Sequence, residues 1–581
     1  MRVLNFLMYL MSKLADRNYF FIKISILFFV FTSCKSSINT ISVPKGSNEI
    51  INLPPKKAQL SEDEMLVWGH ADLKTDTIPG MSIAKAHDFL KGKKGVKVIV
   101  AIADSGVDIE HEDLKDVVWI NPKEIPNNGK DDDSNGYVDD VYGWNFLGNS
   151  SGKIVNADQL EITRIVKKGI KKFGDKKASE IIKEDKKEFE QFLKLKEEYQ
   201  KSVAKNKDEI ANVEETLERL NQIKEHFNAV RNFLGKKEFT ARDLKGLRPK
   251  SIKVAMQIAD VSSLLERGVA ESELDEFRAD ANEVKKNLYK IKKGYDLNFN
   301  SRQSMGDDLY DINDKYYGNN NVIGSKDLEM HGTHVAGITA ATRNNNLGIN
   351  GVANNVKIMT IRIVPDGDEH DKDVALGIRY AVDNGAKIIN TSFGKRFSPN
   401  KKWVFDAIQY AADKDVLIVN AAGNDSKNLD KRHTYPSDSK DLLSEFVDNV
   451  ITIGATSAFY SKKLVASFSN YGKLNVDVFA PGDEIYSTVP KNDYEAVSGT
   501  SMAAPAVSGV AALIRSYYPQ LSASQVKRIL MNSGTKIDMN VLKPGSPMDT
   551  VPFSELSVSG RIVNAYNALK MADRMVRGKT N

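Results

Sequence analysis

The chain has 581 residues, 41% of them hydrophobic, which is enough for a substantial core in roughly two to four domains. Its 82 basic and 77 acidic residues give a formal net charge of only +5, and 8% aromatic content is ordinary, so nucleic acid is not expected as a partner. The single cysteine, Cys34, excludes an intrachain disulfide and a cysteine metal cluster.

Residues 1–33 have the order of a secretory signal, in which basic residues precede the apolar run 24–31. That run is short for a membrane span. Residues 31–34 are Phe-Thr-Ser-Cys, a sequence that resembles the lipobox of bacterial lipoproteins, although Phe31 stands where Leu is usual. We expect a lipid anchor on Cys34 and an extracytoplasmic location at a bacterial membrane, on the periplasmic face or the cell surface; an uncleaved anchor is the alternative. Residues 34–67 are expected to be a tether and N-terminal extension.

A buried strand is predicted over residues 96–103, an almost continuous run of Val, Ile and Ala. Asp104 follows directly. Open α/β sheets place catalytic side chains beyond the carboxyl ends of their strands, so this position suits chemistry. A turn-forming aspartate before Ser105-Gly106 is the alternative.

The acidic loop 131–140 has the spacing of a calcium-binding loop. Counted from Asp131, oxygen-bearing side chains occupy positions one, three, five and nine, a glycine occupies position six, and the residue at position seven offers its backbone carbonyl. Position twelve is Tyr142 instead of a bidentate glutamate, with Asp140 as a candidate substitute. The alternative is a solvated acidic turn. The expected ligands of a structural calcium ion are Asp131, Asp133, Asn135, Tyr137 and Asp139.

From about residue 160 to 293 the chain is rich in Lys and Glu and nearly free of Pro, as expected of helices. Apolar residues recur there at alternating steps of three and four, which predicts the seam of an antiparallel helical hairpin or coiled coil. The seam consists of Phe189, Phe192, Tyr199, Val203, Ile210, Val213, Leu217, Leu220, Phe227 and Leu234. Residues 151–300 are therefore expected to be a helical insertion, either a spacer or an arm that recruits a protein partner or substrate.

Strands then alternate with helices. Strands are expected at 356–364, 386–390 and 416–420, and helices at 373–384, 404–414 and 562–576. This rhythm predicts a parallel sheet with helices on both faces. The fold class is α/β, a three-layer doubly wound sandwich with a mostly parallel central sheet, plus the long, coiled-coil-like α-helical insertion.

Two small-residue helices open with chemically capable side chains, His331 and Ser501. Ser501 lies where unpaired N–H groups and the helix dipole favour negative charge. The alternative is that this serine only caps the helix. A metal pair formed by His331 and His334 is disfavoured because no acidic residue completes an H-E-x-x-H pattern.

Asp104, His331 and Ser501 together form a candidate triad. A serine needs a base to become a nucleophile, and the base needs a carboxylate to hold its tautomer. Asn424, which follows the strand at 416–420, can stabilise an oxyanion together with the N–H of Ser501.

Four sequence blocks, in order, resemble those of subtilisin-like serine peptidases. They are Asp104-Ser105-Gly106, His331-Gly332-Thr333-His334, Ala422-Gly423-Asn424 and Gly499-Thr500-Ser501-Met502-Ala503-Ala504-Pro505. The resemblance covers about residues 96–148 and 310–572. It implies a serine endopeptidase in two parts, 68–150 and 301–581, that acts on polypeptides without an organic cofactor. It also implies that Ser392, Phe393 and Gly394 form the strand edge that pairs with the substrate.

Two features depart from this family. Asp104 and His331 are 227 positions apart, an excess that the insertion explains. Residues 34–96 are too short for the usual inhibitory pro-domain. The alternative function is a protease-derived binding or scaffold protein that acts through the insertion.

Overall fold

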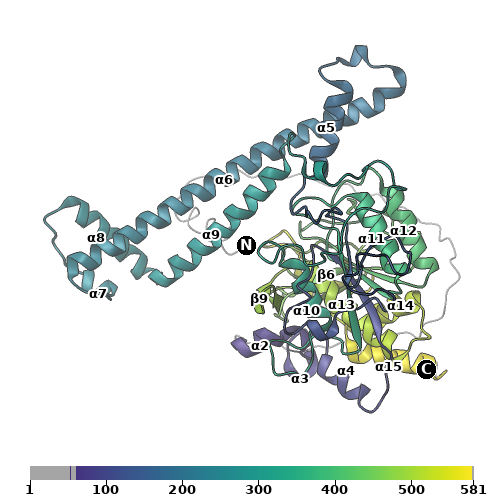
Figure 1. The fold of residues 1–581 in the computed structure, drawn as a ribbon. Coiled ribbons are helices and arrows are strands. Elements are labelled where there is room, and N and C mark those ends of the chain that lie inside the picture. Colours follow the sequence, from purple (N-terminus) through teal and green to yellow (C-terminus); the bar gives the residue numbers. More distant parts are fainter. Residues whose placement is uncertain (1–52, 54–59, 579–581) are drawn as a thin grey trace, which may run out of the picture. The chain divides into compact units, whose positions relative to one another are not determined.

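The structure is a computed structural model that describes residues 53 and 60–578. The predicted signal segment and Cys34 lie outside the described residues. The chain divides into two compact units, a helical one at 163–297 and an α/β one whose described residues lie within 41–162 and 298–581 (Figure 1). None of the described helices combines the length and the apolar character needed to cross a membrane.

The α/β unit is built on a nine-stranded sheet of order β10-β13-β7-β6-β5-β4-β1-β3-β2. All neighbouring pairs are parallel except β10 with β13. The mostly parallel sheet predicted from the sequence is thus confirmed. Its strands are β1 (Val98–Asp104), β2 (Gly143–Asn145), β3 (Val356–Arg362), β4 (Ile388–Thr391), β5 (Leu417–Ala421), β6 (Val450–Thr456), β7 (Val478–Pro481), β10 (Thr535–Lys536) and β13 (Arg561–Ile562).

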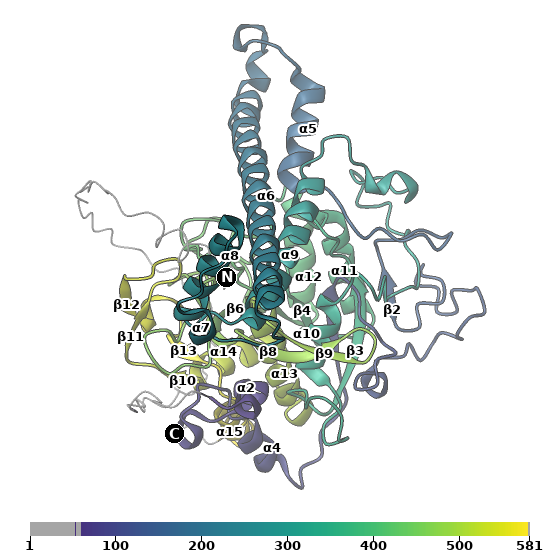
Figure 2. The same cartoon turned by 90° about the vertical axis from the view of Figure 1, so that its left-hand side faces the viewer.

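The two faces of the sheet are covered by different helices. Alternate residues of β1 show this division, because Val98, Val100 and Ile102 pack in one hydrophobic cluster and Ala101 and Ala103 in another. The first cluster includes side chains of α4 (Ile83–Leu90), α10 (His331–Ala340), α13 (Thr500–Tyr517), α14 (Ala523–Ser533) and α15 (Ala565–Val576). The second includes α11 (Asp371–Asp383) and α12 (Lys401–Asp413). The three-layer arrangement is therefore confirmed (Figure 2).

Smaller elements complete this unit. The sequence did not predict β6, β7 or two antiparallel hairpins, β8 (Ile485–Val489) with β9 (Asp493–Val497) and β11 (Asn540–Leu542) with β12 (Thr550–Pro552). The remaining helical turns are α2 (Glu62–Val67), η1 (Trp68–His70), α3 (Leu73–Asp76), η2 (Lys115–Val117), η5 (Ser301–Ser304) and η6 (Phe553–Glu555).

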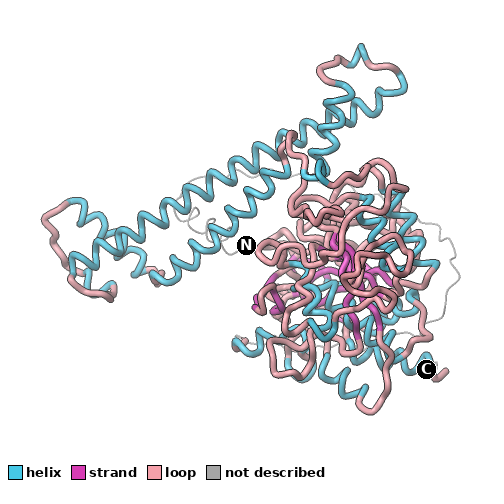
Figure 3. The backbone as a smooth tube through the Cα atoms, in the orientation of Figure 1, coloured by secondary structure: helices cyan, strands magenta, loops and turns pink. Residues whose placement is uncertain are grey.

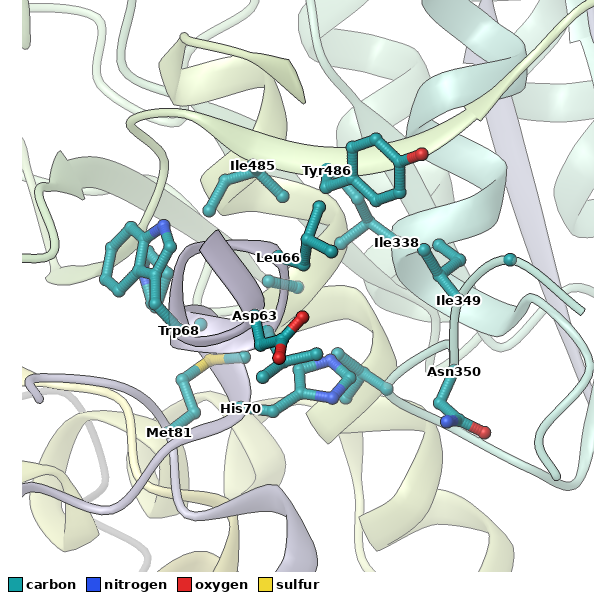
Figure 4. Close-up of a pocket in the computed structure, with 16 residues that line it drawn as sticks. Asp63, Leu66, Trp68, His70, Met81, Ile338, Ile349, Asn350, Ile485 and Tyr486 are labelled. Atoms are coloured by element: carbon teal, nitrogen blue, oxygen red, sulfur yellow. The ribbon is translucent and has the colours of Figure 1, made fainter. Parts of the chain in front are cut away.

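The helix α2 lies inside the stretch 34–67 that was predicted to be tether and extension, and it ends against the domain. The adjoining Trp68 is only 1% exposed, and its indole N–H is 3.1 Å from the carbonyl oxygen of Asp483. Beside it is a largely apolar cavity of about 400 Å³, which Figure 4 shows lined by residues of α2, α10 and β8 that include Leu66, Ile338 and Ile485. The last part of the predicted extension is thus packed on the domain.

The helical unit confirms the predicted long helical insertion (Figure 3). Its elements are most of α5 (Glu161–Phe173), η3 (Ala178–Glu180), η4 (Lys183–Asp185), the 49-residue α6 (Lys186–Leu234), α7 (Ala241–Leu244), α8 (Ile252–Glu266) and α9 (Glu271–Gly294).

The long helix α6 runs antiparallel to α9. Ile210 and Val213 pack with Leu288 and Ala281, and a polar seam residue, Asn206, donates from Nδ2 to the Leu288 carbonyl at 3.2 Å. Of the ten predicted seam residues, Tyr199, Val203 and Leu234 are half-buried and the other seven are buried. The unit at 163–297 falls within the insertion predicted at 151–300.

Candidate active site

The carboxyl end of β1 and the start of α10 bring Asp104 and His331 together. Asp104 is the last residue of β1 and is 1% exposed, and His331 is the first residue of α10. The His331 Nδ1 atom lies 2.7 Å from Asp104 Oδ1, and the backbone N–H of Ser105 donates to the same oxygen at 2.7 Å. The carboxylate therefore holds the imidazole with its Nδ1–H toward Asp104, which leaves Nε2 to accept a proton.

The charge of Asp104 also sets the basicity of this histidine. Burial lowers the pKa of His331, but the attraction of the Asp104 carboxylate and its hydrogen bond outweigh burial, so that the pKa is raised above 6.5. A base with a raised pKa binds a proton more firmly when one is transferred to it.

Ser501 is the second residue of α13, which begins at Thr500 directly after the extended Gly499. Its hydroxyl donates to the Ser392 carbonyl at 2.9 Å, and the Ser392 hydroxyl donates to the Ser501 carbonyl at 2.8 Å. This reciprocal pair ties the start of α13 to the residue after β4. Transfer of the hydroxyl proton to His331 requires the Ser501 side chain to leave the Ser392 carbonyl, an adjustment of the kind that substrate binding brings about.

Asn424 lies three residues beyond β5 and is oriented by Thr500. The backbone N–H and the hydroxyl of Thr500 both donate to Asn424 Oδ1, each at 2.9 Å. Because the carbonyl oxygen of the amide accepts these two bonds, the nitrogen is the end that faces away from Thr500. An exposed amide N–H₂ beside Ser501 is suited to stabilising an oxyanion.

The second histidine of the block, His334, contacts a different part of the fold. It is buried, and its Nε2 lies 3.0 Å from the Glu495 carbonyl in β9. Burial lowers the pKa of His334 to about 4, so it is neutral near pH 7. The histidine pair therefore does not converge on one metal position.

The predicted substrate-binding residues follow β4. Ser392 is buried and bonded to Ser501, Phe393 is half-buried, and Gly394 is exposed. Phe393 and Gly394 line a cavity of about 260 Å³ whose wall also includes Ser501 and Asn424.

The acidic loop forms a compact carboxylate cluster of Glu124, Asp133 and Asp140, with one oxygen of each within 4.8 Å of the others. Glu124 is 7% exposed, and its Oε2 is buried without a hydrogen-bond partner. Burial raises the pKa of Asp140 to about 6. Three buried carboxylates repel one another unless a cation or protons neutralise them, and oxygen-only ligands suit calcium.

The structure distributes the five predicted calcium ligands unevenly. Asp133 is in the cluster, and Asn135 donates to Asp140 at 3.0 Å. The carboxylate of Asp131 instead accepts the N–H groups of Asn135 and Gly136.

The other two predicted ligands also make contacts elsewhere. Asp139 accepts the N–H groups of Asn128 and Gly129. The ring of Tyr137 packs against Trp144, but the predicted ligand is its backbone carbonyl, which this ring contact does not involve. Sequence reasoning missed Glu124, because it precedes the loop and no spacing rule includes it.

This fold and these side chains define a class. A parallel sheet carries an Asp–His pair at one strand end, with a serine at the N-terminus of a buried helix and a carboxamide beside it. That combination is typical of α/β serine hydrolases.

The comparisons with known proteins specify the family. Residues 95–547 match the model of the Subtilase family, so the chain belongs to that family. It is 42% identical over 191 residues to a thermophilic serine proteinase of Bacillus sp. (strain AK1), covering 33% of this chain and 43% of that protein. It is 40% identical over 212 residues to subtilisin DY of Bacillus licheniformis, covering 36% of this chain and 71% of that protein. It is 39% identical over 208 residues to thermitase of Thermoactinomyces vulgaris, covering 36% of this chain and 68% of that protein.

Proposed function

We propose that this chain is a serine endopeptidase in which Asp104, His331 and Ser501 form the catalytic triad. The observation that carries the proposal is the 2.7 Å contact between Asp104 and His331, which joins residues 227 positions apart at the end of the sheet where Ser392, just after β4, bonds to Ser501. Membership of the subtilase family supports the same reaction class.

In the proposed reaction, Ser501 Oγ attacks the peptide carbonyl carbon while its proton passes to His331 Nε2. The resulting oxyanion accepts hydrogen bonds from the Ser501 N–H and from Asn424 Nδ2. The C–N bond then breaks, and His331 returns the proton to the leaving amine, which gives an acyl-enzyme. Water, deprotonated by His331, hydrolyses that ester. Asp104 keeps the imidazole oriented and stabilises its cationic form.

The substrate in this proposal binds as an extended strand. Backbone groups at Ser392, Phe393 and Gly394, just after β4, are placed next to Ser501 and are suited to pairing with a peptide. The lipobox-like sequence ending at Cys34 supports an enzyme anchored by lipid at an extracytoplasmic membrane face, where its substrates are polypeptides. The helical unit is a candidate site for a protein partner.

An active-serine fluorophosphonate probe tests the triad. We expect the full chain to be labelled and Ser501→Ala to remain unlabelled, because only the activated serine reacts. Ser179→Ala, which alters an exposed serine of the helical unit, is the matched control and should label normally. Equal labelling of the wild type and Ser501→Ala would contradict the mechanism. A labelled protein that cleaves no peptide in a mixed library would instead favour a scaffold role.

We also propose that the cluster of Glu124, Asp133 and Asp140 holds a structural calcium ion. The buried, unpartnered Oε2 of Glu124 supports this proposal, since a cation would supply the missing partner.

Calcium removal tests this proposal by calorimetry. We expect EDTA to lower the melting temperature and added calcium to restore it, because an ion bound only by the folded state stabilises that state. Asp140→Asn should weaken the response, whereas Asp116→Asn, at an exposed aspartate outside the cluster, should not. An identical transition with EDTA and with calcium would exclude a structural calcium site here.

A further inference from the structure

The long helix α6 carries different elements at its two ends. Its start packs against α5, and its end packs in a separate hydrophobic cluster with α7 and α8. Phe227 and Val230 of α6 are buried there together with Leu244 of α7. Figure 1 shows α7 and α8 at the end of α6 that is remote from α5. We call residues 236–256, which contain α7 and the start of α8, the distal cap.

The distal cap is strongly basic. It contains seven basic residues and two acidic ones. Lys236 is paired with Asp243 at 2.6 Å, which leaves Glu238 as the remaining acid. In the described part of the chain no ion pair neutralises the other six bases, all of which are exposed: Lys237, Arg242, Lys245, Arg248, Lys250 and Lys253.

The opposite end of α6 has a balanced charge. Residues 171–190 also contain seven basic residues, but six acidic residues accompany them. Lys172, for example, lies 2.8 Å from Asp185 and 2.7 Å from Glu188. The excess of positive charge is therefore concentrated in the distal cap, although the whole helical unit is rich in lysine.

The start of α8 is apolar on two opposite faces. Its inner face packs in the cluster at the end of α6 through Val254, Ile258 and Val261. Its outer face has Ile252 and Met256, which are 81% and 63% exposed, and the exposed Ala255 and Ala259. These four positions follow the spacing of a single helix face. A surface helix usually has polar residues on the face away from its core, so this outer stripe is typical of a binding surface.

We propose that the distal cap binds the surface of an anionic phospholipid bilayer. In this interaction Ile252 and Met256 enter the boundary between headgroups and acyl chains, and the six exposed bases lie among the anionic headgroups. Basic residues near such a surface each strengthen association, and protruding apolar side chains add to it. The proposal goes beyond the peptidase reaction and does not depend on it.

Two observations favour a bilayer over other partners. The bases are spread over α7, the turns beside it and the start of α8, and the apolar side chains protrude, so a broad surface can engage all of them together. Two copies of the cap would repel each other through their like charges, which disfavours self-association. The lipobox-like residues 31–34 independently indicate a membrane location.

A fluorophore attached at one position tests the proposal in the full chain. Cys34→Ser removes the native thiol, and Ala255→Cys places an environment-sensitive label on the outer stripe. We expect vesicles of phosphatidylcholine and phosphatidylglycerol in a two-to-one ratio to shift its emission to the blue, and brominated lipid to quench it. Pure phosphatidylcholine vesicles should have little effect, and added salt should weaken the response. The same label at Ser179→Cys, on the charge-balanced end, should not respond.

Variants in this labelled background separate charge from apolar contact. Changing Lys245, Arg248 and Lys250 to Gln should weaken association at least about tenfold, because each base near an anionic surface contributes roughly a fivefold factor. The matched control changes the exposed Lys176, Lys183 and Lys187 to Gln and should bind as before. Ile252→Gln with Met256→Gln retains the charge but should abolish the quenching by brominated lipid. All variants keep residues 1–33, so any association through that segment is common to them.

Three results would overturn the proposal. In a folded chain, an Ala255→Cys label that ignores anionic vesicles, or that responds equally to pure phosphatidylcholine, would exclude a charge-selected membrane contact. A response to poly-glutamate but not to anionic vesicles would assign the cap to an acidic protein. Self-association without lipid that the Ile252→Gln, Met256→Gln variant abolishes would assign the stripe to a second copy. Fluorophosphonate labelling of Ser501 reports on the peptidase proposal separately, so either proposal can fail alone.

Discussion

The carboxylate of Asp104 has hydrogen-bond partners at only one of its two oxygens. Its Oδ1 accepts from Ser105 and His331, whereas its Oδ2 is buried without a hydrogen-bond partner. Burying an ionised carboxylate with one oxygen unpaired costs free energy unless a nearby positive charge compensates for it. The arrangement therefore favours the protonated, cationic form of His331, which is the form that the proposed mechanism generates.

This electrostatic balance predicts a pH dependence. Proton acceptance requires neutral His331, so kcat/KM should rise with pH through a pKa above 6.5 and then level off. Asp104→Asn should lower that pKa, because burial then acts without the opposing carboxylate, and should reduce kcat by about 10⁴-fold through loss of the correct tautomer. The measurement is a pH profile of peptide hydrolysis.

A neighbouring acid requires a control in that experiment. Burial raises the pKa of Glu329 to about 7, although Arg362 opposes the shift, and Glu329 lies two residues before His331. Glu329→Gln removes this second group and should leave the His331 step in place. A profile that loses its step in Glu329→Gln would reassign the pKa to the glutamate.

At the scale of elements, α5 and α6 meet through a glycine and an aromatic cluster. Phe173, Phe189 and Phe192 pack with ring centroids 5.3 to 6.4 Å apart. A Cβ atom added to Gly169 would lie 2.0 Å from the Phe192 ring. Gly169 is therefore needed for the close approach of the two helices.

Gly169→Ala tests which of two opposing effects is larger. Helix propensity alone favours alanine by about 1 kcal/mol, whereas overpacking costs about 1–3 kcal/mol. Because the ring belongs to a buried three-residue cluster, we expect the clash to dominate and hydrogen exchange to accelerate in residues 163–195. The matched exposed change on α6, Asn232→Ala, should not accelerate it. Slower exchange in Gly169→Ala would show that the cluster adjusts freely.

At the scale of the molecule, each of the two units has hydrophobic clusters of its own. The three large hydrophobic clusters of the α/β unit contain no residue of 163–297, and the helical unit packs its own clusters around α6. The proposed catalytic set, the sheet and the cavity beside Ser501 are all supplied by the α/β unit.

This separation predicts the effect of excising the helical unit. Replacing residues 163–297 with a flexible Gly/Ser linker should preserve fluorophosphonate labelling and hydrolysis of short peptides within about threefold, because the three large hydrophobic clusters of the α/β unit contain no residue of this segment. Labelling and peptide kinetics check this outcome. Loss of labelling together with a lowered melting temperature would show that the helical unit supports the catalytic fold.

The sequence alone determined the parallel sheet, the long helical insertion and the family resemblance. Each depends on a local pattern: the apolar run before Asp104, the three- and four-residue steps of α6, and four short motifs. Short-range periodicity dictates which face of an element is buried, so it can be recognised before any contact is known. The roles of Asp104, His331, Ser501 and Asn424 stay predictions that the geometry supports.

Only the tertiary structure decided which distant side chains meet. Glu124 joins Asp133 and Asp140, the Ser501 hydroxyl bonds to Ser392, and Arg432 shares a cavity wall with Arg396. These pairings depend on loop paths and on backbone bridges such as Lys395 with Tyr435, for which the sequence has no periodic signal. Residues on loops acquire their neighbours from the packing of the whole sheet, and for that reason these contacts became visible only in three dimensions.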